Sequence, residues 1–222
     1  MKLIDLIYPP RCPLCGNVTT EKDKTFPLCE RCFDLQKKEI FDKITDATDY
    51  LPQNKAFYCA YKYNGLLRDA VIKYKFNGEI WMAKPFSIFI INAVEKCGGF
   101  ESVDYLTYVP VSQIRLAERG YDQTFEIVKE ISKSKGIPIL KCLLKDNNKG
   151  DNASEKKNRH SRVSEKGYFF IGKKNEIKNK NILLVDDILT TGATIMECTE
   201  LLLENGAKTV SSAVLASGRK DF

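Results

Sequence analysis

The segment at residues 181–194 constrains the fold of this 222-residue chain more than any other part. It starts with a continuous apolar run at 182–185, continues with two adjacent aspartates and ends in a threonine-rich turn around Gly192. An uninterrupted apolar run is typical of a strand buried on both faces of a parallel sheet. The segment therefore predicts a buried strand, a turn and a helix within an α/β fold.

Each part of this segment has a chemical use. Ligands of parallel sheets bind beyond the carboxyl ends of the strands, which is where we expect Asp186 and Asp187. Their carboxylates can accept hydrogen bonds from the vicinal hydroxyls of a ribose. The turn and the positive end of the following helix can hold a phosphate through hydroxyl and backbone N–H groups. The turn residues are Thr190, Thr191, Gly192, Ala193 and Thr194.

This segment has two alternative interpretations. A phosphate-binding P-loop is a poor alternative, because its glycine and lysine spacing is absent. A purely structural turn leaves two adjacent acids beside a threonine-glycine turn unexplained. The segment therefore favours a ligand that joins a sugar to a phosphate.

The chain from residue 51 onward alternates strand and helix patterns, which is typical of the α/β class. Strands are predicted at 56–63, 103–110, 168–171, 181–185 and 210–216. Helices are predicted from Leu66 to Tyr74, from Pro85 to the glycines at 98 and 99, from Asp122 to Gly136, and from the signature turn to Asn205. Residues 111–120 are predicted to form a basic connection without regular structure.

Four of the eight cysteines form two Cys-x-x-Cys pairs, Cys12 with Cys15 and Cys29 with Cys32. Two such pairs can supply four thiolates to one tetrahedral Zn²⁺ at about 2.3 Å. Redox thiols or inert buried thiols are the alternatives, although a redox motif does not ordinarily occur twice at this spacing. Four thiolates close the coordination shell, so the predicted zinc is structural. Turn-forming residues at 51–54 place the end of this module near residue 50.

The formal net charge of +6 permits a polyanionic partner, although a solvated basic face explains it equally well. Basic residues are concentrated at 145–162, in a hydrophilic segment that suits either a binding loop or a plain surface loop. The candidate nucleic-acid contacts in it are Lys156, Lys157, Arg159 and Arg162. The single histidine, His160, is interpreted as an exposed loop residue.

Aromatic and basic residues also alternate at 58–75, a combination that can stack bases and neutralise phosphates. The tyrosines concerned are Tyr58, Tyr61, Tyr63 and Tyr74. Core packing is the preferred interpretation for most of them, because several recur at strand or helix spacing. No membrane insertion is expected, since the start of the chain lacks a long apolar centre and the apolar stretch at 85–94 is far shorter than the roughly 20 residues that span a bilayer.

The segment from Ile182 to Thr194 resembles the phosphoribosyl-pyrophosphate (PRPP) signature of the type I phosphoribosyltransferases. The cysteine pairs and the segment at 115–123, which follows Val109-Pro110-Val111, narrow the resemblance to the ComF family. Lys75-Phe76 also fits that family, whereas Tyr121 and Asp122 stand where relatives commonly have phenylalanine and asparagine.

The resemblance implies a twisted, mainly parallel sheet flanked by helices at 51–222, preceded by a zinc-binding module at 1–50. It also implies PRPP with Mg²⁺ as ligand, with Asp186 and Asp187 on the ribose hydroxyls and 190–194 around the 5′-phosphate. Arg115 and Arg119 are candidates for the pyrophosphate, because a guanidinium offers forked donors to phosphate oxygens. A surface ion pair is the alternative for Arg115.

Three functions remain open at this stage. The resemblance implies a cytoplasmic PRPP-binding protein of natural transformation that handles incoming single-stranded DNA together with DNA-uptake or recombination proteins. A second possibility is an active Mg²⁺-dependent phosphoribosyltransferase that acts on a base or an amine, for which no general base is identifiable. The third is a zinc-stabilised structural adaptor, against which the intact signature residues argue.

Overall fold

The computed structural model describes residues 9–19, 27–36, 51–145, 168–172 and 174–219. The predicted boundary near residue 50 lies at the edge of these ranges, and residues 37–50 fall outside them. Most of the predicted basic segment, including all four candidate nucleic-acid contacts and His160, also lies outside the described residues.

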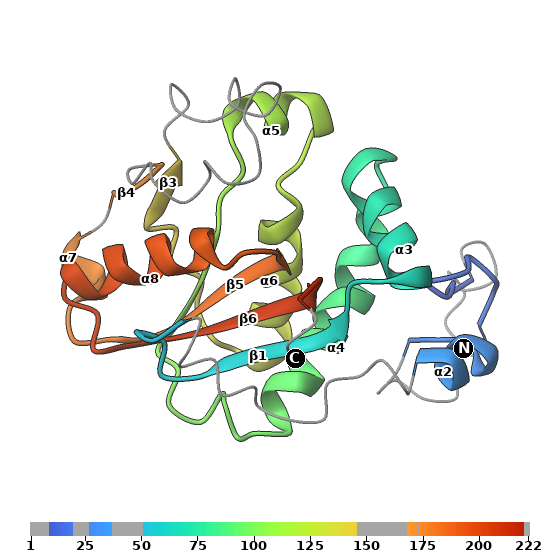
Figure 1. Cartoon of the computed structure of the whole chain (residues 1–222), viewed down its shortest axis with the longest axis horizontal. Coiled ribbons are helices and arrows are strands. Elements are labelled where there is room, and N and C mark those ends of the chain that lie inside the picture. Colours follow the sequence, from blue (N-terminus) through green and yellow to red (C-terminus); the bar gives the residue numbers. More distant parts are fainter. Residues whose placement is uncertain (1–8, 20–26, 37–50, 146–167, 173, 220–222) are drawn as a thin grey trace.

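A four-stranded parallel sheet forms the centre of the protein (Figure 1). Its strands lie in the order β1-β6-β5-β2, and every neighbouring pair is parallel. Their bounds are β1 Phe57–Lys62, β2 Tyr105–Tyr108, β5 Asn181–Leu189 and β6 Thr209–Ser217. The predicted α/β class with a mainly parallel sheet is confirmed.

The central strands are buried on both faces, which explains their continuous apolar runs. Leu183 and Val185 of β5 belong to one buried cluster, whereas Ile182 and Leu184 belong to the other. Because successive side chains of a strand point to opposite faces, each face of the sheet receives its own layer of helices.

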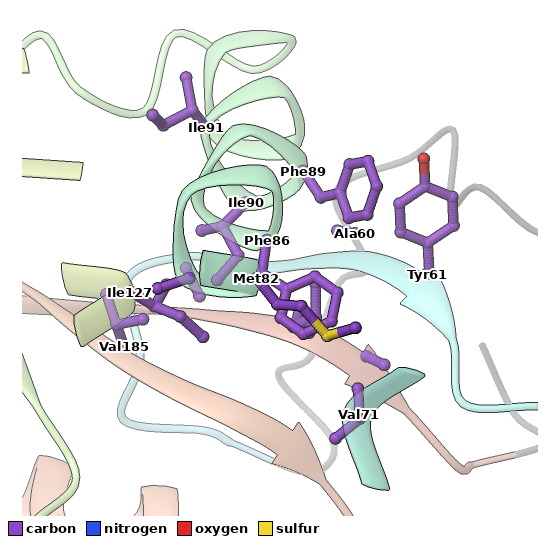
Figure 2. Packing of buried hydrophobic residues seen from close by; sticks show 14 of the residues in the cluster. Ala60, Tyr61, Val71, Met82, Phe86, Phe89, Ile90, Ile91, Ile127 and Val185 are labelled. Carbon is purple, nitrogen blue, oxygen red and sulfur yellow. The ribbon is translucent and has the colours of Figure 1, made fainter. Parts of the chain in front are cut away.

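Figure 1 shows α8, Ala193–Glu204, on one face of the sheet, with α4, Ala83–Glu95, and α6, Gln123–Lys135, on the other. In Figure 2, Phe86 and Ile90 of α4 pack toward the strands, and Ile127 lies beside Val185. These side chains are fully buried, so the sheet is held from both sides by apolar contacts.

Smaller elements complete the described fold. They are α2 Glu30–Gln36, α3 Gly65–Phe76, the 3-10 helix η1 Ile80–Met82, α5 Gln113–Arg119, β3 Leu143–Lys145, β4 Phe169–Ile171 and α7 Lys174–Ile177. The predicted strand at 168–171 is present, but it pairs with β3 in a separate two-stranded sheet. Among the described residues, no helix combines the length and the apolar character that crossing a membrane would require.

The prediction that residues 111–120 form an irregular connection is wrong, because α5 occupies most of this segment. Ser112 caps its first turn by accepting a hydrogen bond from the N–H of Arg115 at 3.3 Å. Gly120 ends it in the left-handed conformation, at φ 76°. The capping residues were visible in the sequence, but the helix buries no residue and therefore lacks the apolar stripe on which the prediction relied.

The cysteine-containing N-terminal segment joins the core of the sheet domain. Cys12, Leu14 and Cys32 belong to the same buried cluster as the residues of α4. The two parts therefore share apolar packing. A substitution at these cysteines is expected to change the stability of the sheet domain as well.

Candidate functional site

The four cysteines of the predicted zinc site converge in the structure. Their Sγ atoms all lie within 4.8 Å of one another, and Cys15 and Cys29 approach to 3.6 Å. Four sulfurs at about 2.3 Å from a tetrahedral Zn²⁺ lie about 3.8 Å apart, so the cluster has the size that such an ion requires. The backbone turns back at Gly16, at φ 78°, and the N–H of Cys12 donates to the carbonyl of Asn17 at 2.8 Å.

Burial of two of these thiols supports a cation at the centre of the cluster. Cys12 and Cys32 are almost completely buried, and burial raises the pKa of both thiols. A buried thiol stays neutral unless a cation stabilises its thiolate, which is what Zn²⁺ does for coordinating cysteines. The residues present therefore fit a closed, structural zinc site.

The predicted sugar-phosphate segment lies at the carboxyl end of the central strand β5. Asp186 and Asp187 fall within this strand, which continues to pair with β6 until Leu189 opposite Ser217. Sequence analysis ended the strand at residue 185, four residues too early. The acid pair is thus held by backbone hydrogen bonds on a rigid element rather than on a loose turn.

The turn after β5 leads directly into the amino-terminal end of α8. Thr190 and Thr191 are exposed, and Gly192 is the N-cap of the helix at φ 87°. The hydroxyl of Thr191 accepts from the N–H of Ala193 at 3.4 Å, and the N-cap residue Gly192 has no side chain that could accept from the other N–H groups of the first turn. The turn therefore leads directly into the first-turn N–H groups and the positive end of α8, an arrangement that favours an anion.

Asp187 is the best-connected residue of the site. Its Oδ2 accepts from the ammonium of Lys75 at 2.8 Å and from the side-chain amide of Gln123 at 3.2 Å. Gln123 in turn accepts from the guanidinium of Arg119 at 2.8 Å. One chain of contacts thus joins α3, α6, the end of α5 and the acid pair.

The surroundings of Asp186 favour its protonated form. Burial, and then the negative charge of Asp187, raise the pKa of Asp186 to about 8, while the N–H of Asp187 donates to its Oδ1 at 2.8 Å. Asp186 therefore keeps its proton to a higher pH than an exposed carboxyl group does.

Arg119 lies close to the acid pair, and Arg115 lies on the exposed side of α5. Burial, and then the charge of Arg115, lower the pKa of the Arg119 guanidinium. Its Nε is buried and has no hydrogen-bond partner within the described part of the chain. Two guanidinium groups near each other favour an anion between or beside them.

Two further polar residues contact the acid pair and were not predicted from the sequence. Lys75 and Gln123 occur in segments that carried the family resemblance, but neither was assigned to the ligand site. Tyr121 and Asp122, which depart from the family pattern, have structural roles. The hydroxyl of Tyr121 donates to the carbonyl of Tyr74, and Asp122 caps α6 through the N–H of Phe125 at 3.0 Å.

The tyrosines considered for base stacking do not form such a surface. Tyr58, Tyr61 and Tyr74 are almost fully buried, and Tyr63 is half-buried against the same core. The preference for core packing is confirmed for the three buried rings.

Two family descriptions match the chain. Residues 125–221 match the phosphoribosyl transferase domain, and residues 3–40 match the double zinc ribbon domain. Together with the parallel sheet and the four-cysteine cluster, these matches define the class as a phosphoribosyltransferase-like domain with an N-terminal zinc ribbon. The chain belongs to the ComF/ComFC family.

Three curated relatives support membership of the ComF/ComFC family. The competence protein ComFC of Streptococcus pneumoniae is 32% identical over 82% of this chain and 79% of its own length. ComFC of Bacillus subtilis is 28% identical over 92% of this chain and 76% of its own length. The DNA utilization protein YhgH of Escherichia coli K12 is 24% identical over 90% of this chain and 80% of its own length.

Solved structures also align with part of the chain, at lower sequence identity. Glutamine phosphoribosylpyrophosphate amidotransferase of B. subtilis, complexed with ADP and GMP, aligns with a TM-score of 0.38 at 18% identity, over 63% of this chain and 26% of that one. The hypoxanthine phosphoribosyl transferase of Trypanosoma cruzi aligns with a TM-score of 0.37 at 12% identity, over 66% and 69%.

Proposed function

We propose that this protein binds PRPP together with Mg²⁺ and acts in DNA uptake, where it handles single-stranded DNA in the cytoplasm. The arrangement of residues at the end of β5 is the observation that supports PRPP as the ligand. Two acidic residues on a rigid strand precede a turn that leads into the amino terminus of α8, whose N-cap is a glycine. The acidic residues can accept hydrogen bonds from ribose hydroxyls, and the helix end can bind a phosphate, so both parts suit one phosphoribosyl ligand.

The residues have separate roles in this proposal. Asp186 and Asp187 accept hydrogen bonds from the ribose hydroxyls, and residues 190–194 hold the 5′-phosphate. Arg115 and Arg119 bind the pyrophosphate as forked donors. Mg²⁺ supplies charge neutralisation on the pyrophosphate oxygens. Lys75 and Gln123 keep Asp187 in position, because both contact the same oxygen of that residue.

The DNA-related role is supported by the printed names of the relatives. They include competence proteins in S. pneumoniae and B. subtilis and a DNA utilization protein in E. coli. The positive net charge is compatible with a polyanion. Lys156, Lys157, Arg159 and Arg162 remain sequence-based candidates for DNA contacts, and DNA-uptake or recombination proteins are the proposed partners.

Calorimetric titration of Mg²⁺ and PRPP into the purified chain tests the ligand. Wild type is expected to bind, and an Asp186→Asn/Asp187→Asn variant is expected to lose binding while remaining folded by circular dichroism. A matched control is Asp34→Asn, which changes an exposed acid of α2 and leaves the site intact. If wild type and the double variant bound PRPP with equal affinity, these two carboxyl groups would not take part in PRPP binding.

An active phosphoribosyltransferase is the second candidate function. It is favoured by a specific observation, since Arg119 and the acid pair lie together in one connected set of contacts rather than scattered over the surface. Measuring pyrophosphate release from PRPP in the presence of bases, amines or single-stranded DNA distinguishes a transferase from a PRPP-binding protein. Release that requires an acceptor and is lost in the double variant identifies a transferase, whereas binding without release identifies a PRPP-responsive binding protein. Absence of PRPP binding would leave the structural adaptor.

A further inference from the structure

The segment from the end of α3 through η1 exposes three large apolar side chains to solvent. Phe76 is 67% exposed, Ile80 is 44% exposed and Trp81 is 41% exposed. All three lie within six residues, at the end of α3 and in η1. Clustered exposed aromatic residues mark an interaction site more often than single ones do.

Basic residues flank both rings. Lys73 precedes Phe76 by three residues in α3, and Lys84 follows Trp81 by three residues where η1 runs into α4. Lys73 and Lys84 are both exposed, and residues three apart on a helix lie on the same side of it, so their positions in the sequence place them near the rings. The acidic residue of this stretch, Glu79, accepts a hydrogen bond from the indole N–H of Trp81.

This aromatic-basic surface, formed by Phe76, Ile80, Trp81, Lys73 and Lys84, adjoins the acid pair. Lys75, next to Phe76, contacts Asp187 at 2.8 Å. The guanidinium of Arg119 lies 4.9 Å from the centre of the Phe76 ring and also contacts Gln123. The contact of Arg119 with Phe76, together with the contact of the neighbouring Lys75 with Asp187, thus connects the surface to the proposed ligand site.

We propose that the aromatic-basic surface binds single-stranded DNA by stacking unpaired bases on Phe76 and Trp81, with Lys73 and Lys84 on the phosphates. The proposal rests on the DNA-handling function and gives that function a place on the described part of the chain. Exposed rings interleaved with cations are the arrangement by which proteins bind single strands without sequence preference. Protein–protein interfaces, in contrast, are depleted in lysine, which disfavours a second copy or another protein as the occupant.

The chain carries a built-in probe for this binding. Trp81 is the single tryptophan of the sequence, so its fluorescence reports on this surface alone. Titration of wild type with an oligothymidylate is expected to quench that emission in a saturable manner, since a stacked base changes the surroundings of the indole.

Substitutions identify the surface. Phe76→Ala and Trp81→Ala are each expected to weaken oligothymidylate binding by about tenfold, measured by the anisotropy of a labelled strand. Phe170→Ala is the matched control, because Phe170 is a comparably exposed ring, at 48%, on the distant strand β4. Lys73→Gln/Lys84→Gln is expected to reduce the slope of log affinity against log salt by about 1.4, and Lys133→Gln/Lys208→Gln is expected to leave it unchanged.

The outcomes separate this inference from the function on which it rests. Tight binding by wild type and by both aromatic variants would reject the surface and leave DNA handling intact. No binding by wild type, with or without Mg²⁺ and PRPP, would reject DNA handling together with the surface. A change in sedimentation mass in Trp81→Ala, without a change in DNA affinity, would make the surface an interface between copies of the chain and overturn the proposal.

Discussion

The ammonium of Lys75 lies 2.8 Å from Oδ2 of Asp187, which joins the last turn of α3 to the strand that carries the acid pair. Only 18% of the lysine side chain and 8% of the aspartate side chain are exposed. An ion pair this well shielded costs stability when one partner is removed, because the remaining charge stays buried without a counter-ion. The pair therefore fixes the position of Asp187 before any ligand arrives.

Lys75→Gln is expected to lower the free energy of unfolding by about 2 kcal/mol, as measured by urea denaturation. Adding Asp187→Asn to this variant should recover part of the loss, because the uncompensated charge is then gone. Lys73→Gln changes an exposed lysine of the same helix and should stay within about 0.5 kcal/mol of wild type. Equal stability of the two single lysine variants would show that the contact contributes nothing.

Gly192→Ala tests the turn before α8. Gly192 has φ 87°, and an added Cβ would meet Leu51 at 3.5 Å, so the backbone conformation rather than the available space requires glycine. The substitution is expected to cost about 1 kcal/mol and to weaken PRPP binding, since the turn must shift to relieve the strain. Gly218→Ala lies in open space without a positive φ and should change neither quantity. Unchanged affinity in Gly192→Ala would argue against a phosphate at this turn.

The strand–turn–helix at 181–204 was predictable because local chemistry fixes it. A continuous apolar run, two acids and a glycine that must adopt a positive φ each point to the same structure without reference to the rest of the chain. The four cysteines were predictable for the same reason, since their spacing alone defines a ligand set.

Lys75 and Gln123 could not be assigned in this way. Lys75 sits among core residues of α3, and its sequence position gives no indication that it reaches a strand more than a hundred residues later. The exposure of Phe76 and Trp81 was equally hidden, because aromatic residues at helical spacing predict core packing, as they do correctly for Tyr74. Tertiary contacts decide which residue Lys75 contacts and whether Phe76 and Trp81 are buried.

Removal of zinc is expected to destabilise the whole protein. Cys12 and Cys32 lie in the same buried cluster as the residues of α4, so loss of the metal should lower the melting temperature of the sheet domain rather than produce a separate early transition. Cys12→Ser should lose stoichiometric zinc, measured by elemental analysis, and melt at least about 5 °C lower. Cys97→Ser, a half-buried cysteine outside the cluster, is the control. A zinc-free wild type with an unchanged melting temperature would contradict this prediction.

Asp186 should make the stability of the ligand-free protein fall as the pH rises. Its pKa is raised from 3.8 to about 8, first by burial and then by the charge of Asp187, so the folded state holds the proton more tightly than the unfolded state does. The stabilising contribution is complete below pH 3.8 and is lost as the pH rises through about 8.

Asp186→Asn cannot lose this proton, so its free energy of unfolding should exceed that of wild type by more than about 1 kcal/mol above pH 8, and the difference should shrink toward pH 4. Urea denaturation over this range, without Mg²⁺ or PRPP, measures the difference. Asp69→Asn changes an exposed carboxyl of α3 and should give a curve parallel to that of wild type. A parallel curve for Asp186→Asn as well would show that the pKa of Asp186 is not raised in the folded protein.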